Sequence, residues 1–387
     1  MVGGGPGGAT VARYLAMAGR PLDITLIEPK PRFTTAFFSN LYLAGLRSLD
    51  SLIHGYEALA GQHGVRILQD RAGSVDPAAK TVRLAGGASL PYDRLVIAPG
   101  VMFREGAIAG YDNAAAQVMP HAWTGGPQTT VLRRQLEAMS DGGVFIIAAP
   151  ATPYSCPPGP YERASLVAAY FKQCKPRSKI LILDAKDSFY GQALFEGAWN
   201  RHYPGMIEWL PAQFIGAIEA VDVKSRAVVT ASETFSADVA NVIPPQMAAS
   251  LAQQAGLADQ TGWCPVDPTT FESLLQRDIH LVGDAIGAGA MPKSASAANS
   301  QAKACASAIV TALTGLDRAQ PELSNACYTI LAADDAVSNA IGFKVADGKI
   351  AVADILTSRL HQSAAIRAET ARAADRWYAA ITRDIFG

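Results

Sequence analysis

The chain has 387 residues and a formal net charge of −1, and 49% of its residues are hydrophobic. This length gives room for two or three domains, since domains usually hold roughly 100 to 200 residues. Lysines and arginines are dispersed, so no basic face for nucleic acid or anionic lipid is indicated. No apolar run reaches the roughly 18 residues of a membrane-spanning helix. The totals indicate a globular α/β protein.

Metal and haem signatures are missing from the sequence. The five cysteines are too few for a disulfide framework, and none are spaced C-x-x-C. The six histidines are scattered and without H-x-x-x-H spacing. We therefore predict no metal site and no haem attached to this chain.

The N-terminal stretch carries a dinucleotide-binding pattern. Residues 3–8 contain G-x-G-x-x-G, and a helical stretch over 11–18 follows. A predicted strand over 23–27 then ends at Glu28, about 20 residues after Gly8, where such folds place the carboxylate that binds the adenosine ribose. Motif, helix, strand and acid in this order predict a bound dinucleotide.

Two later segments indicate that the dinucleotide is FAD. Residues 92–100 and 278–284 are predicted strands similar to the second and third flavin-contact motifs of flavoproteins with two dinucleotide domains. In the third motif Asp284 would hold the ribityl chain. The helix after Ser294 directs its positive end towards the flavin in this interpretation, while Lys293 either adds to that effect or is a solvated lysine. The predicted FAD-binding residues are Gly3, Gly5, Pro6, Gly7, Gly8, Glu28, Pro29, Lys30, Ser39, Asn40, Ala72, Ala98, Pro99, Gly100, Gly283, Asp284 and Lys293.

A second α/β unit lies between the flavin segments. Its predicted strands cover 143–149 and 179–184, its helix covers 165–173, and Asp184 mirrors Glu28. The glycine motif is absent from its first turn, and the prolines there remove backbone amide donors. These prolines are Pro157, Pro158 and Pro160. The unit therefore has the form of an NADH domain whose nucleotide site is lost.

Cys156 occupies that altered turn. It precedes a predicted helix, whose N-terminal amides would favour a thiolate. The alternative is a rigid loop that holds a buried, inert thiol.

The last part of the chain has a different character. Residues 325–331 are predicted to form a strand, 345–349 a hairpin turn and 363–381 a helix. We predict a discontinuous FAD-binding domain over 1–110 and 245–316, a second Rossmann-like domain over 111–244, and a small α+β interface domain over 317–387.

Several motifs together carry a family resemblance. They occupy residues 156–165, 262–267, 291–294, 299–301, 325–328 and 377–381. With them, essentially the whole chain resembles the flavoprotein subunit of flavocytochrome c sulfide dehydrogenases. The resemblance implies an α/β fold with two Rossmann-like domains of the disulfide-reductase or sulfide:quinone-reductase type.

The resemblance also implies a redox-active disulfide between Cys156 and Cys327. Hydrosulfide would attack it, leaving a persulfide on one cysteine and a thiolate on the other, and electrons would pass through FAD to a one-electron carrier. Which cysteine is attacked first stays open, as does the sulfur product. Glu162 is a candidate proton acceptor, or else only complements the helix dipole. Of the remaining cysteines, Cys174 and Cys305 are interpreted as small core residues and Cys264 as a structural residue.

One residue departs from some members of the family. Ala36 stands where these members have the cysteine that bonds the flavin, so we predict non-covalent FAD. The family further implies a separate c-type cytochrome subunit that carries the haem, and a periplasmic location. Because only two residues precede the glycine motif, we expect the natural protein to begin earlier. The resemblance to the family implies an export signal upstream.

Three alternatives are kept. A sulfide:quinone reductase would need apolar C-terminal helices, and residues 366–376 are too polar for that role. A non-catalytic flavoprotein partner of a sulfur-carrier protein is hardly distinguishable by sequence. An NAD(P)H-dependent disulfide reductase is disfavoured by the missing second glycine motif.

Overall fold

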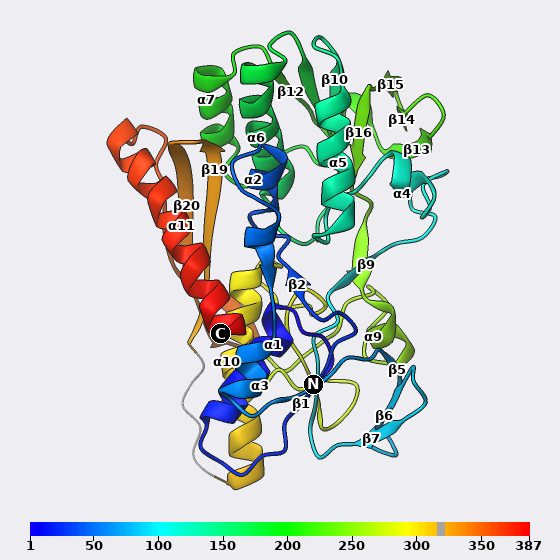
Figure 1. Cartoon of the computed structure of the whole chain (residues 1–387), viewed down its shortest axis with the longest axis vertical. Helices are drawn as coiled ribbons and strands as arrows, with labels where there is room; N and C mark the ends of the chain where they lie inside the picture. The colour runs from blue at the N-terminus through cyan, green and yellow to red at the C-terminus, as the bar shows by residue number, and fades with distance from the viewer. Residues whose placement is uncertain (316–321) are drawn as a thin grey trace.

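A parallel sheet forms the lower half of the molecule in Figure 1. The computed structural model describes residues 1–315 and 322–387. Strand β1 (Thr25–Ile27) pairs with β4 (Arg66–Leu68), and β8 (Leu95–Ile97) pairs with β18 (Ile279–Leu281). Val2 joins the two pairs through parallel bridges to Ile27 and Ile97. The strands predicted within 92–100 and 278–284 are confirmed, and segments far apart in sequence share this sheet.

A second parallel sheet forms the upper half. Its strand order is β12 (Ile207–Leu210), β11 (Lys179–Asp184), β10 (Val144–Ala149) and β16 (Val239–Val242). Helices pack around it, namely α5 (Pro127–Ala138), α6 (Gly159–Cys174) and α7 (Gln192–His202). The predicted pair of Rossmann-like α/β units is therefore confirmed.

Short elements complete the two units. The antiparallel strands are β2 (Phe33–Thr34) with β3 (Ile53–His54); β5 (Ala72–Asp76) with β6 (Thr81–Leu84) and β7 (Ser89–Pro91); β9 (Val101–Phe103) with β17 (Gln246–Ala248); and β13 (Ile218–Asp222) with β14 (Ala227–Thr230) and β15 (Thr234–Ser236). The helices are α1 (Pro6–Met17), α2 (Ser39–Leu43), η1 (Asp50–Leu52), α3 (Glu57–Gly61), α4 (Ala115–Val118), α8 (Ala212–Ile215), α9 (Ser250–Gln254) and α10 (Ala295–Thr314).

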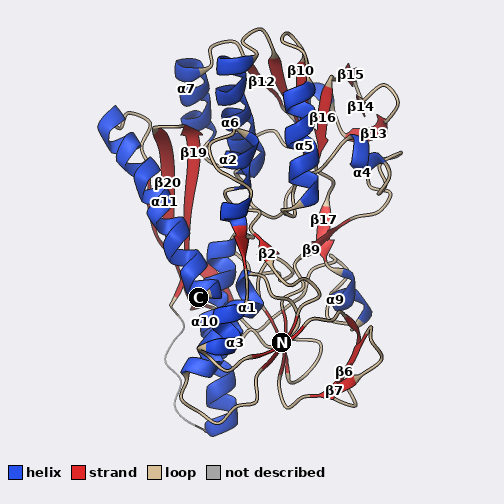
Figure 2. Ribbon diagram, viewed as in Figure 1, coloured by secondary structure: helices blue, strands red, loops and turns tan. Residues whose placement is uncertain are grey.

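The C-terminal segment is a three-stranded antiparallel sheet with one long helix beside it (Figure 2). The strands are β19 (Leu323–Ala332), β20 (Asp335–Ala346) and β21 (Lys349–Thr357), and the helix is α11 (Ala364–Phe386). The predicted hairpin turn is confirmed between β20 and β21, where Asp347 and Gly348 both have positive φ. The helix runs beyond the predicted end at residue 381 because Ile385 and Phe386 are buried against the first unit.

This segment packs against both α/β units. Phe343 and Ile385 belong to the core of the FAD-type unit, whereas Leu331 and Val337 belong to the core of the second unit. The predicted boundary between residues 316 and 317 lies outside the described residues. The interpretation of Cys174 as a core residue is wrong, because it is the exposed last residue of α6.

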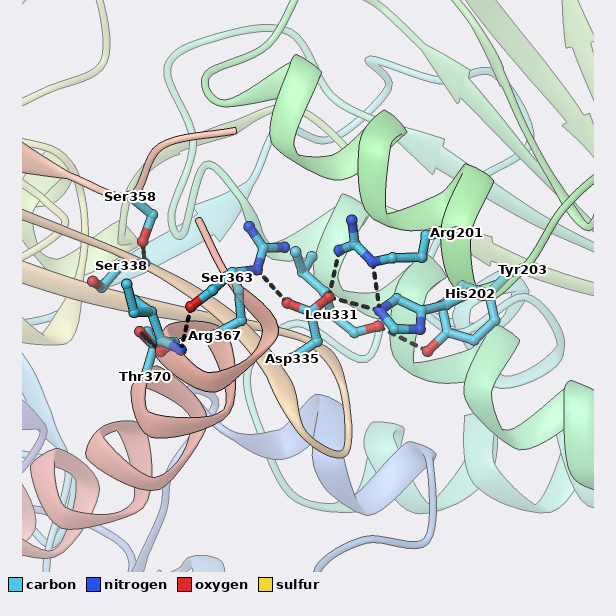
Figure 3. A network of polar contacts seen from close by, with 11 residues as sticks. Arg201, His202, Tyr203, Leu331, Asp335, Ser338, Ser358, Ser363, Arg367 and Thr370 are labelled. Atoms are coloured by element: carbon cyan, nitrogen blue, oxygen red, sulfur yellow. Dashed lines mark hydrogen bonds and ion pairs between the residues drawn. The ribbon is translucent and has the colours of Figure 1, made fainter. Parts of the chain in front are cut away.

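A buried carboxylate anchors the turn between β19 and β20 (Figure 3). Asp335 lies 2.6 Å from both Arg201 Nη2 and His202 Nε2 at the end of α7, and it also accepts a hydrogen bond from Arg367 of α11. Burial raises the pKa of Asp335, but the hydrogen bonds from Arg367, His202 and Arg201 outweigh it, and the pKa ends below its ordinary value. The network therefore ties three elements together through one charge.

We expect Asp335→Ala to lower the free energy of unfolding by about 3 kcal/mol, because the buried Arg367 would lose its counter-charge. Urea unfolding at neutral pH measures this. Because the folded pKa lies below the unfolded value of 3.8, the stabilisation is present above that pH and is lost as the pH falls further. Asp334→Ala, at the exposed neighbouring position, is the control. Equal stability of the two variants would contradict the anchor.

Candidate functional site

The glycine motif forms a tight turn between the first sheet and α1. Gly3 has φ of +96°, and a Cβ there would lie 2.3 Å from the carbonyl oxygen of Ala98. A Cβ on Gly8 would lie 1.9 Å from the carbonyl oxygen of Gly3. The first turn of α1 has no acidic residue and no side-chain cap, so its amides are free for an anion. The turn therefore fits the pyrophosphate of FAD.

Glu28 follows the end of β1, beside that turn. Its Oε2 accepts a hydrogen bond from the amide of Gly4 at 2.8 Å, and its Oε1 accepts one from the amide of Lys30 at 3.0 Å. These contacts fix the carboxylate close to the glycine turn. This is the place at which a ribose hydroxyl could donate to it.

The other predicted FAD-binding residues occupy several elements. Ala98, Pro99 and Gly100 follow β8, and Gly283 and Asp284 follow β18, so the parallel pairing of these strands brings both groups to one edge. Ala72 begins β5, and Ser39 and Asn40 begin α2, where the Ser39 hydroxyl donates to the carbonyl of Ala36. Their roles in FAD binding stay predictions.

The loop that carries Cys156 is fastened to the flavin-motif segment after β18. Ser155 Oγ donates to Asp284 Oδ2 at 2.7 Å, and the amide of Cys156 donates to the carbonyl of Lys293 at 2.7 Å. The pKa of the Asp284 carboxyl is raised by burial. The second α/β unit thus delivers its cysteine to the predicted flavin site of the first.

Lys293 is held inside this junction. Its ammonium donates to the carbonyls of Asp284 at 2.9 Å and Ile286 at 2.6 Å, and it lies 3.6 Å from the ring centre of Trp263. Burial lowers its pKa to about 8. The alternative of a freely solvated lysine is therefore wrong, and its action on a flavin stays a prediction.

Two cysteines and a glutamate come together from distant parts of the chain. Cys156 precedes α6, Glu162 lies in the first turn of α6, and Cys327 is on β19. Burial raises the pKa of Cys156 well above its usual value, and the nearby Cys327 and Glu162 add to this. Burial and Glu162 likewise raise the pKa of Cys327 to about 12. The expectation that helix amides favour a Cys156 thiolate is wrong, because burial and acidic neighbours dominate.

Glu162 has fixed hydrogen-bond partners. Its Oε2 accepts from Asn40 Nδ2 at 2.8 Å, and its Oε1 accepts from the amide of Ile330 at 3.0 Å. Burial nevertheless raises its pKa above the ordinary value. A carboxyl with a raised pKa beside two cysteines can hold a proton that sulfur chemistry releases.

Arg163 was not predicted as a site residue, yet it organises this cluster. It is almost fully buried, and its Nε donates to Asn40 Oδ1 at 3.0 Å while its Nη1 donates to Asn241 Oδ1 at 2.7 Å. Burial lowers its pKa to about 10. Asn40 is thus held between Arg163 and Glu162. A single arginine without a motif gives no sequence signal for this role.

The nucleotide site of the second unit is filled by protein groups. Asp184 accepts hydrogen bonds from Tyr161 Oη at 2.6 Å and Trp209 Nε1 at 2.9 Å, and it forms an ion pair with Lys186. Phe189 stacks on Tyr161 with ring centres 3.5 Å apart. The carboxylate of Asp184, which corresponds to Glu28 in the first unit, is therefore bonded to protein side chains in place of a nucleotide. This agrees with the predicted loss of the NADH site.

Comparison with known proteins identifies the family. Residues 129–244 match the model for the central part of the sulfide dehydrogenase [flavocytochrome c] flavoprotein chain, and residues 319–386 match that for flavocytochrome c sulphide dehydrogenase, flavin-binding. The flavoprotein chain of Chlorobaculum thiosulfatiphilum sulfide dehydrogenase is 50% identical over 40 residues, which is 10% of this chain and 83% of that sequence. The chain belongs to this family of flavoproteins. Residues 1–130 also match the pyridine nucleotide-disulphide oxidoreductase model.

More distant relatives share the fold. The mitochondrial sulfide:quinone oxidoreductase of Mus musculus is 23% identical over 298 residues, covering 73% of this chain and 64% of the mouse protein, just under two thirds of its length. The solved sulfide:quinone oxidoreductase of Aquifex aeolicus gives a TM-score of 0.78 at 18% identity, covering 99% of this chain and 91% of that one. The family match supports FAD as the cofactor.

All five cysteines are free thiols in this structure. Cys264 and Cys305 are buried, as interpreted from the sequence. The bond between Cys156 and Cys327 stays a prediction of the family resemblance, now supported by their proximity.

We expect Gly8→Ala to abolish FAD retention, because the new Cβ would collide with the carbonyl oxygen of Gly3 inside the predicted phosphate turn. The ratio of flavin to protein absorbance in the purified variant measures this, with circular dichroism to confirm folding. Gly61→Ala is the matched control, since a Cβ there meets nothing within 4 Å. Full flavin content in folded Gly8→Ala protein would refute the assignment.

Proposed function

We propose that this protein oxidises sulfide to sulfur or polysulfide, using FAD and a redox-active disulfide between Cys156 and Cys327, and passes the electrons to a c-type cytochrome. One observation carries the proposal. Cys156, Cys327 and Glu162 lie together, and the Cys156 loop is hydrogen-bonded to Asp284 and Lys293 of the flavin-motif segment.

The cysteine pair, FAD and the hydrogen bonds of the Cys156 loop have separate roles in the proposed reaction. Hydrosulfide attacks the disulfide, so that one cysteine becomes a persulfide and the other leaves as a thiolate. FAD, when bound, supplies a two-electron acceptor that can release electrons singly to a carrier. The hydrogen bonds of Ser155 and Cys156 hold the cysteine loop against the segment that would carry the flavin.

Glu162 is proposed as the proton acceptor. Hydrogen bonds from the amide of Ile330 and the side chain of Asn40 hold its carboxylate in place, so the carboxylate does not need to turn before it accepts a proton. Its raised pKa brings it closer to the pH at which a general base is effective.

The cofactor, partner and location follow from the family. FAD is proposed to be non-covalent, because Ala36 offers no sulfur for a thioether. A c-type cytochrome subunit that carries haem c is proposed to form a heterodimer with this chain, in the periplasm.

A quinone as electron acceptor is the second candidate, favoured by the similarity to sulfide:quinone oxidoreductases. The structure offers one argument against it. Tyr378, Ile381 and Ile385 of α11 are buried against the rest of the chain and are not available to a bilayer. Among the described residues, no helix is long and apolar enough to cross a membrane.

Anaerobic titration with sulfide tests the proposal. We expect the flavin absorbance of the wild type to bleach, and we expect Cys156→Ser and Cys327→Ser to lose this response, because neither can form the disulfide. Reduction of all three proteins by dithionite is the control for intact FAD. A wild type that stays oxidised under sulfide would refute the sulfide dehydrogenase and favour the partner of a sulfur-carrier protein.

The rate at which the reduced protein is reoxidised distinguishes a cytochrome from a quinone as the electron acceptor. We expect sulfide-reduced protein to reduce a c-type cytochrome faster than it reduces a soluble quinone analogue. The opposite order would favour the quinone reductase, and co-purification with a sulfur-carrier protein in place of a cytochrome would favour the non-catalytic role.

We expect Glu162→Gln to slow sulfide-driven bleaching by about a hundredfold, the usual contribution of a general base. The wild-type rate should fall as the pH drops through the pKa of Glu162, which is raised above 4.5, because protonation removes the base. The ratio of wild-type to variant rates at each pH cancels the ionisation of sulfide itself. A ratio that does not change with pH would leave Glu162 only a structural role.

A further inference from the structure

A row of three residues crosses the C-terminal sheet from the cysteine pair to the sheet edge. Cys327 of β19 is directly opposite Asn339 of β20, and Asn339 is directly opposite Thr357 of the edge strand β21. Directly paired residues project from the same face of a sheet. Cys327 and Asn339 are partly buried, and Thr357 is exposed. The row therefore leads from the protein surface to one sulfur of the pair.

The opposite face of this sheet belongs to α11. Tyr328, the neighbour of Cys327, packs against Trp377 of α11 with ring centres 5.8 Å apart. Because side chains alternate along a strand, Cys327 projects away from α11. It projects towards the side where α6 and α7 contact β19 (Figure 1).

A small cavity lies along the row. Its lining includes Cys327, Asn339 and Thr357 from the sheet, together with Pro158, Tyr190 and Leu194 from the second unit. Cys156 is not part of the lining. The cavity volume is about 30 Å³, whereas one water needs roughly 10 to 15 Å³. A hydrosulfide ion fits this space.

Asn339 is a polar residue of the cavity lining whose side-chain carbonyl oxygen, Oδ1, is buried and lacks a partner in the described part of the chain. An amide offers both donors and an acceptor, and its two ends can exchange by rotation. The side-chain amide of Asn339 can therefore donate to an anionic sulfur in the cavity.

We propose that this cavity is the binding site for hydrosulfide, and that Asn339 positions the incoming sulfur at Cys327. The proposal rests on the proposed sulfide oxidation. In it, Thr357 and the half-exposed Tyr190 form the mouth of the cavity. The small volume selects the substrate by size.

The site assigns the first step to Cys327. Hydrosulfide sulfur forms a bond to Cys327 Sγ, the disulfide bond breaks, and the bonding electron pair leaves as the Cys156 thiolate. The disulfide is reduced, and the incoming sulfur is oxidised to the outer sulfur of a Cys327 persulfide. One negative charge enters with hydrosulfide and one remains on Cys156, so no further reactant is needed.

Two matched pairs of variants test the site by rapid anaerobic mixing of the FAD-loaded protein with sulfide. Thr357→Trp should block the mouth and slow bleaching severalfold. Leu356→Trp should leave the rate unchanged, because Leu356 is 77% exposed and on the other face of the same strand. Asn339→Leu should raise the half-saturating sulfide concentration about tenfold with an unchanged limiting rate, the effect of one lost hydrogen bond. Asn339→Gln, which keeps the amide, should recover much of the affinity.

The outcomes separate the two proposals. Bleaching of the wild type together with equal rates for Thr357→Trp and Leu356→Trp would overturn the cavity as the sulfide site and leave the proposed function standing. A fall in the limiting rate of Asn339→Leu without a change in half-saturation would overturn its positioning role. Failure of the wild type to bleach would overturn both.

Discussion

Two hydrogen bonds at the junction of the α/β units determine the candidate site. Ser155 donates to Asp284, and the amide of Cys156 donates to the carbonyl of Lys293. Together with the hydrogen bonds of Asn40 to Glu162 and Arg163, they fix the position of Cys156 relative to the flavin motifs of the first unit. Hydrogen bonds to a charged carboxylate are stronger than neutral ones, and this one is partly shielded from water. The second unit, in which the nucleotide site is lost, thus holds Cys156 next to the flavin motifs of the first unit.

Buried charge is the second constraint at the site. Asp284 and Glu162 both have pKa values raised by burial, and Arg163 is a buried cation beside Glu162 and Cys156. In such surroundings a thiolate is disfavoured, as the raised pKa values of both cysteines indicate. In the proposed mechanism, attack by hydrosulfide would place one thiolate in these surroundings, and its unfavourable charge would favour passing the electron pair onwards.

Local patterns predicted most of the fold, because strands, the glycine turn and the hairpin depend on neighbouring residues. Glu28 and the β20–β21 turn are examples. The arrangement of Asn40 between Arg163 and Glu162 could not be predicted from local sequence patterns, since its partners lie more than 100 residues away in the sequence. The thiolate prediction for Cys156 failed for a related reason, because burial is a property of the whole fold. The pairing with Cys327 came only from the family resemblance.

The two cysteines are held in different ways, and this difference suits the proposed disulfide, which would have to open and close in each turnover. Cys327 is on a central position of β19, whose turn into β20 is anchored by the Asp335 network. Cys156 is on a loop, in the left-handed conformation with φ of 54°, and both its amide and its carbonyl are hydrogen-bonded. A rigid strand can present one sulfur to an incoming anion at a constant position. A loop held through its backbone leaves the other sulfur free to turn from its partner towards the flavin segment. In the proposed mechanism, Cys327 would therefore bind the substrate sulfur and Cys156 would pass the electron pair to the flavin.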